Sequence, residues 1–139
     1  MGRMAAKGFE DLEVWQKSHR LVLRVYKVTA SFPREEMYGL TSQMRKAAVS
    51  VPANIAEAFK KRSRIDKARI MNIAQGSLEE LRYYFILSRD LKYLAATTQW
   101  TDVEEVARML GSYTGKVLSS TRRPAVVKRT FASYDPSDY

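Results

Sequence analysis

A dense run of cations in the middle of the chain is the strongest chemical signal in the sequence. Segment 60–69 reads KKRSRIDKAR and carries a net charge of +5, because six basic residues accompany one acid, Asp66. The basic residues are Lys60, Lys61, Arg62, Arg64, Lys67 and Arg69, and Arg45 and Lys46 precede them on the same expected helix. Lysine and arginine neutralise phosphates in contacts that depend on salt but little on base sequence. The cluster therefore predicts a site for a nucleic-acid backbone.

A structural role explains part of this charge. Cations near the end of a helix complement its dipole, and Glu57 can pair with Lys61 one turn later. Two or three cations would suffice for these tasks, and cations at the start of the next helix oppose its dipole. The excess favours an anionic partner.

Residues suited to catalysis or metal binding are sparse. His19 is the only histidine and there is no cysteine, so the chain offers no thiolate site or disulfide. Acidic residues occur as adjacent pairs, and adjacent helical residues do not face each other, so they form no acid–base dyad. These pairs are Glu35 with Glu36, Glu79 with Glu80, and Glu104 with Glu105. We expect no enzyme, no metal and no cofactor.

Length and charge are consistent with one basic domain. The chain has 139 residues, 45% of them hydrophobic, and a formal net charge of +9 at pH 7. That length is typical of a single domain, and that charge favours anionic partners. The longest apolar run, residues 83–87, is far below the ~20 residues that span a bilayer. With no secretory signal at the start, we expect a cytoplasmic protein that does not enter the membrane.

Hydrophobic periodicity predicts four helices and no strand. Apolar residues recur in steps of three and four over residues 11–31, 35–62, 66–94 and 102–120. The short connections favour an all-α, antiparallel up-down-up-down four-helix bundle. We place the bundle at residues 9–121, a flexible N-terminus at 1–8, and a tail that is flexible or docked on a partner at 122–139.

Proline at position 52 falls inside the second expected helix. It removes one backbone hydrogen bond and costs ~3 kcal/mol in a regular helix. A helix restarting at Pro52 would need Val51 as its N-cap, and valine is a poor cap. The apolar spacing continues in phase across Pro52, so we predict one continuous helix with a kink.

The first expected helix has an unusually wide apolar face. One stripe includes Leu12 and Trp15, and a second lies beside it. A single bundle core needs a narrower face, so we predict that the second stripe forms a subunit interface. The alternative is a helix buried deeply in its own bundle. The second stripe comprises Val14, Leu21, Val25, Val28 and Phe32.

Two local features of the third expected helix invite predictions. Asp66 is a plausible N-cap. Gly76 lies in mid-helix, where glycine costs up to ~1 kcal/mol relative to alanine. We therefore expect a large side chain, such as that of Trp15, to pack closely against Gly76.

Four sequence blocks resemble a known bacterial family. They read FEDLEVWQKS, FPREEMYGLTSQMRKAAVSVPANIAEAFKKRS, IAQGSLEEL and RMLG, and their order and spacing extend the match over residues 9–118. The chain resembles the four-helix-bundle proteins encoded in 23S ribosomal RNA intervening sequences, also called S23 ribosomal proteins. Ala58 departs from the pattern, because many relatives have glycine after the NIAE motif.

The resemblance implies an assembly but no catalytic residue. The family is similar in fold to the accessory variability determinant of diversity-generating retroelements, a basic pentameric barrel that associates with a reverse transcriptase and nucleic acid. A homo-oligomer, specifically a homopentamer, is therefore implied.

Two functions remain open at this point. The first is a non-enzymatic, oligomeric bundle that binds nucleic acid, specifically structured RNA, through Arg45, Lys46 and segment 60–69. The second is a protein-interaction adaptor that docks an acidic partner such as a reverse transcriptase.

Overall fold

The protein is a bundle of four long helices. The computed structural model describes residues 5–119, so the predicted tail at 122–139 and the first part of the predicted N-terminal segment lie outside it. The order is η1 (Phe9–Asp11), α1 (Glu13–Thr29), η2 (Arg34–Glu36), α2 (Leu40–Lys60), α3 (Arg64–Asp90) and α4 (Thr101–Ser119), with no strand over residues 5–119. The predicted all-α four-helix bundle is confirmed.

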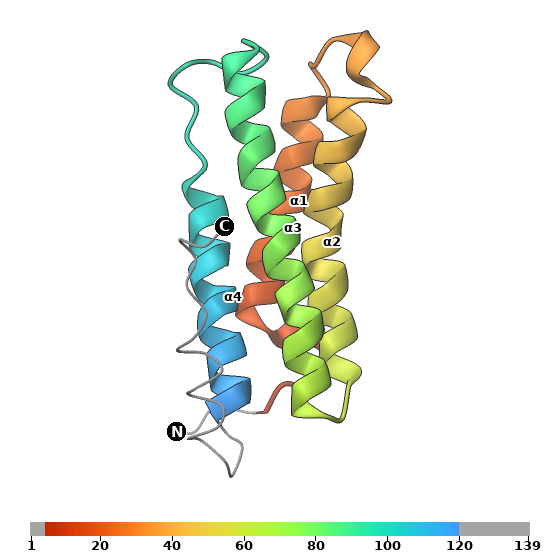
Figure 1. Cartoon of the computed structure of the whole chain (residues 1–139), viewed down its shortest axis with the longest axis vertical. Helices are drawn as coiled ribbons and strands as arrows, with labels where there is room; N and C mark the ends of the chain where they lie inside the picture. Colours follow the sequence, from red (N-terminus) through yellow and green to blue (C-terminus); the bar gives the residue numbers. More distant parts are fainter. Residues whose placement is uncertain (1–4, 120–139) are drawn as a thin grey trace.

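Successive helices alternate in direction. In Figure 1 the colour gradient ascends α1, descends α2, ascends α3 and descends α4. Each helix packs on the next, and α4 also contacts α1, whereas α1 and α3 lie on opposite corners of the bundle. The end of α2, the start of α3 and the end of α4 therefore share the lower end of the molecule in Figure 1.

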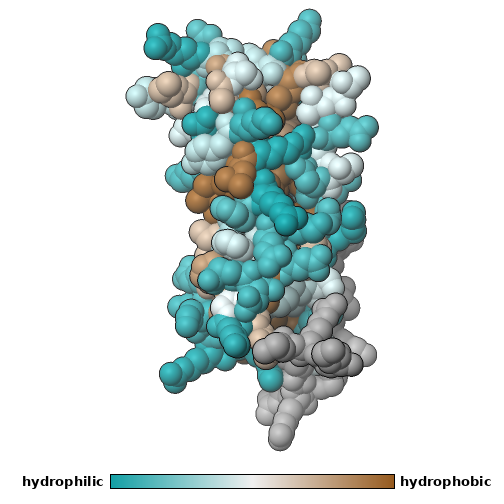
Figure 2. All heavy atoms as spheres, turned by 180° about the vertical axis from the view of Figure 1, so that it is seen from behind, coloured by the Kyte–Doolittle hydropathy of each residue, from teal (hydrophilic) through white to brown (hydrophobic). Residues whose placement is uncertain are grey.

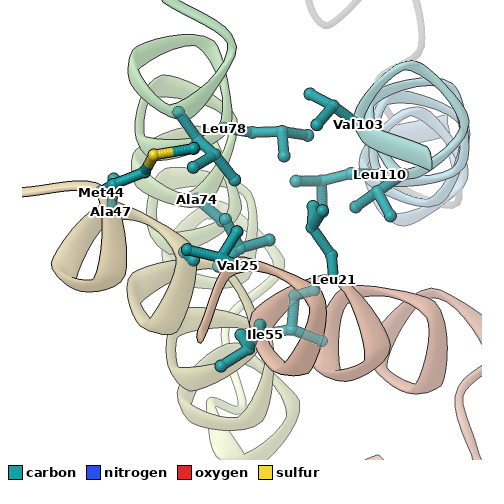
Figure 3. Close-up of a cluster of buried hydrophobic side chains, with 14 of the residues drawn as sticks. Leu21, Val25, Met44, Ala47, Ile55, Ala74, Leu78, Val103 and Leu110 are labelled. Atoms are coloured by element: carbon teal, nitrogen blue, oxygen red, sulfur yellow. The ribbon is translucent and has the colours of Figure 1, made fainter. Parts of the chain in front are cut away.

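Side chains from all four helices meet in the core. Figure 3 shows residues of each helix pointing toward one another, and those it labels are buried. They are Leu21 and Val25 of α1, Met44, Ala47 and Ile55 of α2, Ala74 and Leu78 of α3, and Val103 and Leu110 of α4. Burial of these apolar faces is the main force that holds the helices together.

The second stripe of α1 lies in this core, which corrects the predicted subunit interface. Val14, Leu21, Val25 and Phe32 are at most 8% exposed within one chain, and Val28 packs against the core. The four enclosed side chains offer almost no surface to a second subunit, and Val28 is half-buried. The structure thus matches the alternative, a helix buried deeply in its own bundle.

The start of α2 differs from the prediction. Residues 34–36 form a short 3-10 helix, and α2 begins only at Leu40, with Gly39 as its N-cap. The backbone of Gly39 has φ −114° and ψ −116°, which is not helical and interrupts the expected helix. The apolar periodicity at Met37 therefore belongs to a turn.

Helix α2 continues through Pro52 without a break, as predicted. It spans Leu40–Lys60, and Pro52 is buried within it. The kink at Pro52 stays a prediction.

The predictions for α3 were wrong in two places. Its N-cap is Ser63, whose hydroxyl accepts a hydrogen bond from the Asp66 amide at 3.3 Å, so Asp66 lies in the first turn. A Cβ on Gly76 would have no neighbour within 4 Å. Trp15 lies elsewhere, between the rings of Phe9 and His19, with centroid distances of 5.0 and 5.1 Å.

Helix α3 ends in a motif that normally uses glycine. Lys92 has φ 66°, the only positive φ of a non-glycine residue between positions 5 and 119. Its amide donates to the Arg89 carbonyl, and the Tyr93 amide donates to the Ser88 carbonyl, both at 2.9 Å. These two bonds define a Schellman motif, in which a side chain at the left-handed position is strained.

Replacing Lys92 with glycine should therefore stabilise the protein. We expect the Lys92→Gly variant to have a free energy of unfolding higher by about 0.5–1 kcal/mol, because glycine carries no Cβ penalty at positive φ. Urea unfolding followed by circular dichroism measures this. Lys92→Ala removes the same charge but keeps a Cβ, and an equal gain in that variant would contradict the explanation.

Ion pairs connect α1 to α4. Arg24 bonds Asp102 at 2.6 Å and the Gln99 carbonyl at 2.7 Å, and Lys17 pairs with Glu105 at 2.7 Å. The hydrogen bond from Lys17 lowers the pKa of the Glu105 carboxyl. Two of the four cations of α1 are thereby neutralised within the chain.

Candidate functional site

The turn between α2 and α3 gathers four cations at one corner of the bundle. Lys60 ends α2, Lys61 is its C-cap, Arg62 follows, and Arg64 begins α3. Lys60, Arg62 and Arg64 are exposed, and Lys61 is half-buried. We call these four residues the basic corner. The structure brings them together because the connection between the two helices is only three residues long.

None of the four cations has an ion-pair partner within residues 5–119. Their like charges repel one another, and the start of α3 adds the positive end of its dipole. An anion bound at this corner would reduce the repulsion among the cations and would interact favourably with the α3 dipole. Salt would weaken the attraction between the anion and these charges. The arrangement suits a phosphate group or a carboxylate.

Lys67 has a structural task. Its Nζ donates hydrogen bonds to the carbonyls of Ala58 and Phe59, at 3.1 and 2.9 Å, and lies 5.7 Å from the centroid of the Phe59 ring. These carbonyls belong to the last turn of α2, where the i+4 amides of a continuing helix are missing and the Ala58 carbonyl accepts only the Lys61 amide from the backbone, at 3.1 Å. Burial lowers the pKa of the Lys67 ammonium. Lys67 therefore joins α3 to α2, and its ammonium is engaged within the chain, unlike the four cations of the basic corner.

A variant at Lys67 separates stability from binding. We expect Lys67→Met to lower the free energy of unfolding by about 1 kcal/mol, because two carbonyls lose a charged donor at a partly exposed site. Urea unfolding measures this, and fluorescence anisotropy with a structured RNA should show less than about a tenfold loss of affinity, the order expected for one phosphate contact.

Lys46→Met is the matched control, because Lys46 is exposed and has no hydrogen bond or ion pair in the described part of the chain. It should leave stability within about 0.5 kcal/mol of wild type. Unchanged stability in Lys67→Met would contradict the structural assignment.

The remaining predicted residues lie apart from the corner. Arg69 is exposed on α3 and pairs only loosely with Asp66, at 3.8 Å, so it stays available. Arg45 donates to the Thr29 hydroxyl at 2.9 Å and lies 4.6 Å from the centroid of the Tyr26 ring, so it connects α2 to α1. Lys46 is fourteen residues before Lys60, which places it roughly 21 Å away along the helix.

One cation at the same end was missed from the sequence. Lys116 lies in the last turn of α4, and α4 ends at the lower end of the molecule together with the α2–α3 turn. The alternating direction of the helices could have revealed this. In an up-down-up-down bundle the C-terminal ends of the second and fourth helices lie at the same end. Acidic residues at this end are Glu10 and Asp11 of η1, Glu13 at the start of α1, Glu57 near the end of α2 and Asp66 in the first turn of α3.

Residues 5–119 contain no cluster of the side chains that commonly bind metal ions. No group of three or more histidine, cysteine, aspartate or glutamate side chains within residues 5–119 is placed to hold an ion. His19 is exposed and its ring stacks on Trp15. No helix over the same residues is both long and apolar enough to cross a membrane.

Comparison with known proteins gives one family and one fold. The family model described as "23S rRNA-intervening sequence protein" matches residues 10–112. A solved structure similar to this chain is a protein of unknown function from the S23 ribosomal protein family of Bacteroides thetaiotaomicron. It is 23% identical with a TM-score of 0.54, over 76% of this chain and 95% of that one, and this likeness shows the fold. Curated proteins give no match.

Proposed function

The chain belongs to the 23S rRNA-intervening sequence protein family, and we propose that it is a non-enzymatic protein that binds structured RNA through the phosphate backbone. The observation that carries the proposal is the basic corner, where four cations adjoin one turn and have no ion-pair partner among residues 5–119. Arg69, exposed on α3, and Lys116, in the last turn of α4 at the same end of the bundle, are further cations outside the basic corner.

Elementary electrostatics supports this function. A phosphate backbone offers closely spaced negative charges, and cations that neutralise them release counterions, which drives binding. Such contacts position a protein on a nucleic acid without reading its sequence. The name of the family links it to ribosomal RNA, which favours RNA over DNA and a cytoplasmic location.

Titration at two salt concentrations tests the proposal. A fluorescently labelled, structured RNA is titrated with protein at about 50 and about 200 mM salt, and the dissociation constant is read from anisotropy. Four phosphate contacts predict that the logarithm of the affinity falls with the logarithm of salt with a slope of about −3 to −4. Binding no tighter than that of an unrelated protein with the same net charge would refute the proposal.

We also propose that the protein works as a homo-oligomer, with five copies as the family resemblance implies. Several basic corners in one assembly would bind one long RNA more tightly than a single corner. Light scattering should then give a mass of about five times the 16.0 kDa chain. A 16.0 kDa species at micromolar concentration would refute self-association.

A second candidate function is an adaptor that docks an acidic protein such as a reverse transcriptase. The connection between α1 and α2 favours it, because Met37 and Tyr38 are large and exposed there, Tyr38 at 93%. Exposed aromatic residues often anchor protein interfaces. Co-purification that survives nuclease treatment would support the adaptor, and loss of the partner on nuclease treatment would refute it.

A further inference from the structure

The exposed face of α1 carries cations and rings around one apolar side chain. Leu23 is 57% exposed, and the residues one turn before and after it are exposed as well, namely His19, Arg20, Tyr26 and Lys27. Residues three and four apart are neighbours on the surface of a helix, so these five side chains form one patch, which we call the α1 patch. Figure 2 views the molecule from the side of α1 and shows hydrophobic side chains exposed in its upper half among hydrophilic ones.

A short column of rings ends in this patch. Phe9, Trp15 and His19 follow one another with centroid distances of 5.0 and 5.1 Å, and the planes of the last two rings are nearly parallel, at 8°. Within residues 5–119, Trp15 is the only ring in contact with the exposed imidazole of His19. A nucleobase stacked on His19 would continue the column, as bases do on the aromatic side chains of proteins that bind single strands.

Tyr26 provides a second ring in the patch. It is 44% exposed, and the guanidinium of Arg45 lies 4.6 Å from its centroid. Arg45 is itself held by its hydrogen bond to the Thr29 hydroxyl, so the ring is supported from one side before any ligand binds. Tyr26 follows His19 by seven residues, or about 10 Å along the helix. That distance matches about three nucleotides at ~3.4 Å each.

The charge of the patch is positive. Arg20 and Lys27 have no ion-pair partner within residues 5–119, whereas the other two cations of α1 form the ion pairs with α4 described above. Helix α1 has no acidic residue after Glu13. The patch therefore favours an anionic ligand.

The neighbouring elements do not reverse this sign. On the α4 side, the carboxylates of Asp102 and Glu105 each pair with a cation of α1, and Arg108 adds a positive charge near Glu105. On the α2 side, Arg45 is a further cation. In the connection that follows α1, the exposed charges of residues 34 and 35 cancel.

We propose that the α1 patch binds unpaired nucleotides of the same RNA whose phosphates contact the basic corner. Bases stack on His19 and Tyr26, and phosphates bind Arg20 and Lys27. The inference rests on the proposed RNA binding and gives it a second surface, which takes a single strand that leaves the helical part of the RNA. A single strand combines negative charge with open ring faces, and the patch combines positive charge with exposed rings.

A single strand can reach the patch from the basic corner. The corner lies at the lower end of the molecule in Figure 1, where α1 begins, and α2 lies between α1 and α3. Helix α1 has 17 residues and is about 26 Å long, whereas about ten nucleotides span roughly 34 Å. The carboxylates at this end repel the strand, so favourable contacts begin at His19. They belong to Glu10, Asp11, Glu13 and Glu57.

Two RNA probes separate the patch from the corner. Both are fluorescently labelled and contain the same hairpin, and only the second carries a single-stranded extension of about ten adenosines. We expect the wild-type protein to bind the extended hairpin at least about tenfold more tightly at about 100 mM salt, because phosphate contacts and stacked bases are added. Equal affinity for the two probes would overturn the inference alone. Binding of neither probe would refute the proposed function and the inference with it.

A charge variant tests the phosphate contacts. Arg20→Gln combined with Lys27→Gln should abolish most of the gain from the extension and lower the salt slope for the extended hairpin by about 2, with affinity for the plain hairpin nearly unchanged. Arg82→Gln combined with Lys92→Gln is the matched control. It removes the same charge from exposed residues on α3 and just after it, so it should keep the gain. An equal loss in the control would overturn the assignment to the patch.

An aromatic variant tests the stacking. His19→Ala combined with Tyr26→Ala should weaken binding of the extended hairpin by about fivefold or more and leave the salt slope unchanged, because stacking releases no counterions. Tyr83→Ala is the matched control, since that ring is 55% exposed on α3, and it should bind both probes like the wild type. Circular dichroism checks that each variant is folded. A changed mass in light scattering with unchanged RNA affinity would assign the patch to a protein contact and overturn the inference.

Discussion

Replacing Lys60, Arg62 and Arg64 with glutamine is expected to weaken binding of a structured RNA by about two to three orders of magnitude at about 100 mM salt. Each lost phosphate contact removes about one unit from the salt dependence, and that corresponds to nearly tenfold in affinity at this salt concentration. The slope of log affinity against log salt should decrease in magnitude by about 2 to 3. Anisotropy titrations of wild type and variant at several salt concentrations measure both quantities.

A charge-matched variant controls for the loss of net charge. Arg34, Lys92 and Arg108 are exposed and lie outside the basic corner, and their replacement by glutamine removes the same total charge. This control should lose less than about tenfold in affinity, because distant charges are screened beyond ~10 Å at this salt. Equal losses in the two triple variants would show that net charge, and not the corner, drives binding.

Replacing Phe85 with alanine should have the largest effect on stability. Phe85 is fully buried on α3, its ring stacks on Trp100 with centroids 6.0 Å apart, and the Arg24 guanidinium lies 5.1 Å from it. The cavity left by the ring is expected to cost about 3–5 kcal/mol. Because domains of this size are stable by only about 5–15 kcal/mol, the loss is a large part of the total.

Thermal unfolding followed by circular dichroism checks this result. The midpoint should fall by roughly 10–20 °C. Tyr38→Ala removes an aromatic ring that is 93% exposed, and it should change the free energy of unfolding by less than about 0.5 kcal/mol. A small shift in Phe85→Ala would show that the helices do not pack around this ring.

Much of the fold could be predicted because hydrophobic periodicity records which residues are buried. The four helices follow from it, including the passage of α2 through Pro52. Periodicity does not record what covers a buried residue, so the face of α1 around Val25 was assigned to a second subunit when the chain's own core covers it. The start of α2 was missed because Gly39 interrupts a pattern that continues on either side.

The candidate site could be predicted in part. Lys60, Lys61, Arg62 and Arg64 lie together because they are neighbours across a short turn, which sequence alone reveals. The tasks of Lys67 and Arg45 depend on partners far along the chain, namely carbonyls at the end of α2 and the hydroxyl of Thr29. No local pattern indicates such contacts.

The most direct test of the central proposal is to map where RNA touches the protein. Ultraviolet crosslinking of the wild-type protein to a structured RNA, followed by mass spectrometry of the peptides, gives the contacted residues. We predict crosslinks in the peptides that contain Lys60, Lys61, Arg62 and Arg64. Crosslinks confined to other surfaces, with none at the basic corner, would contradict the proposal.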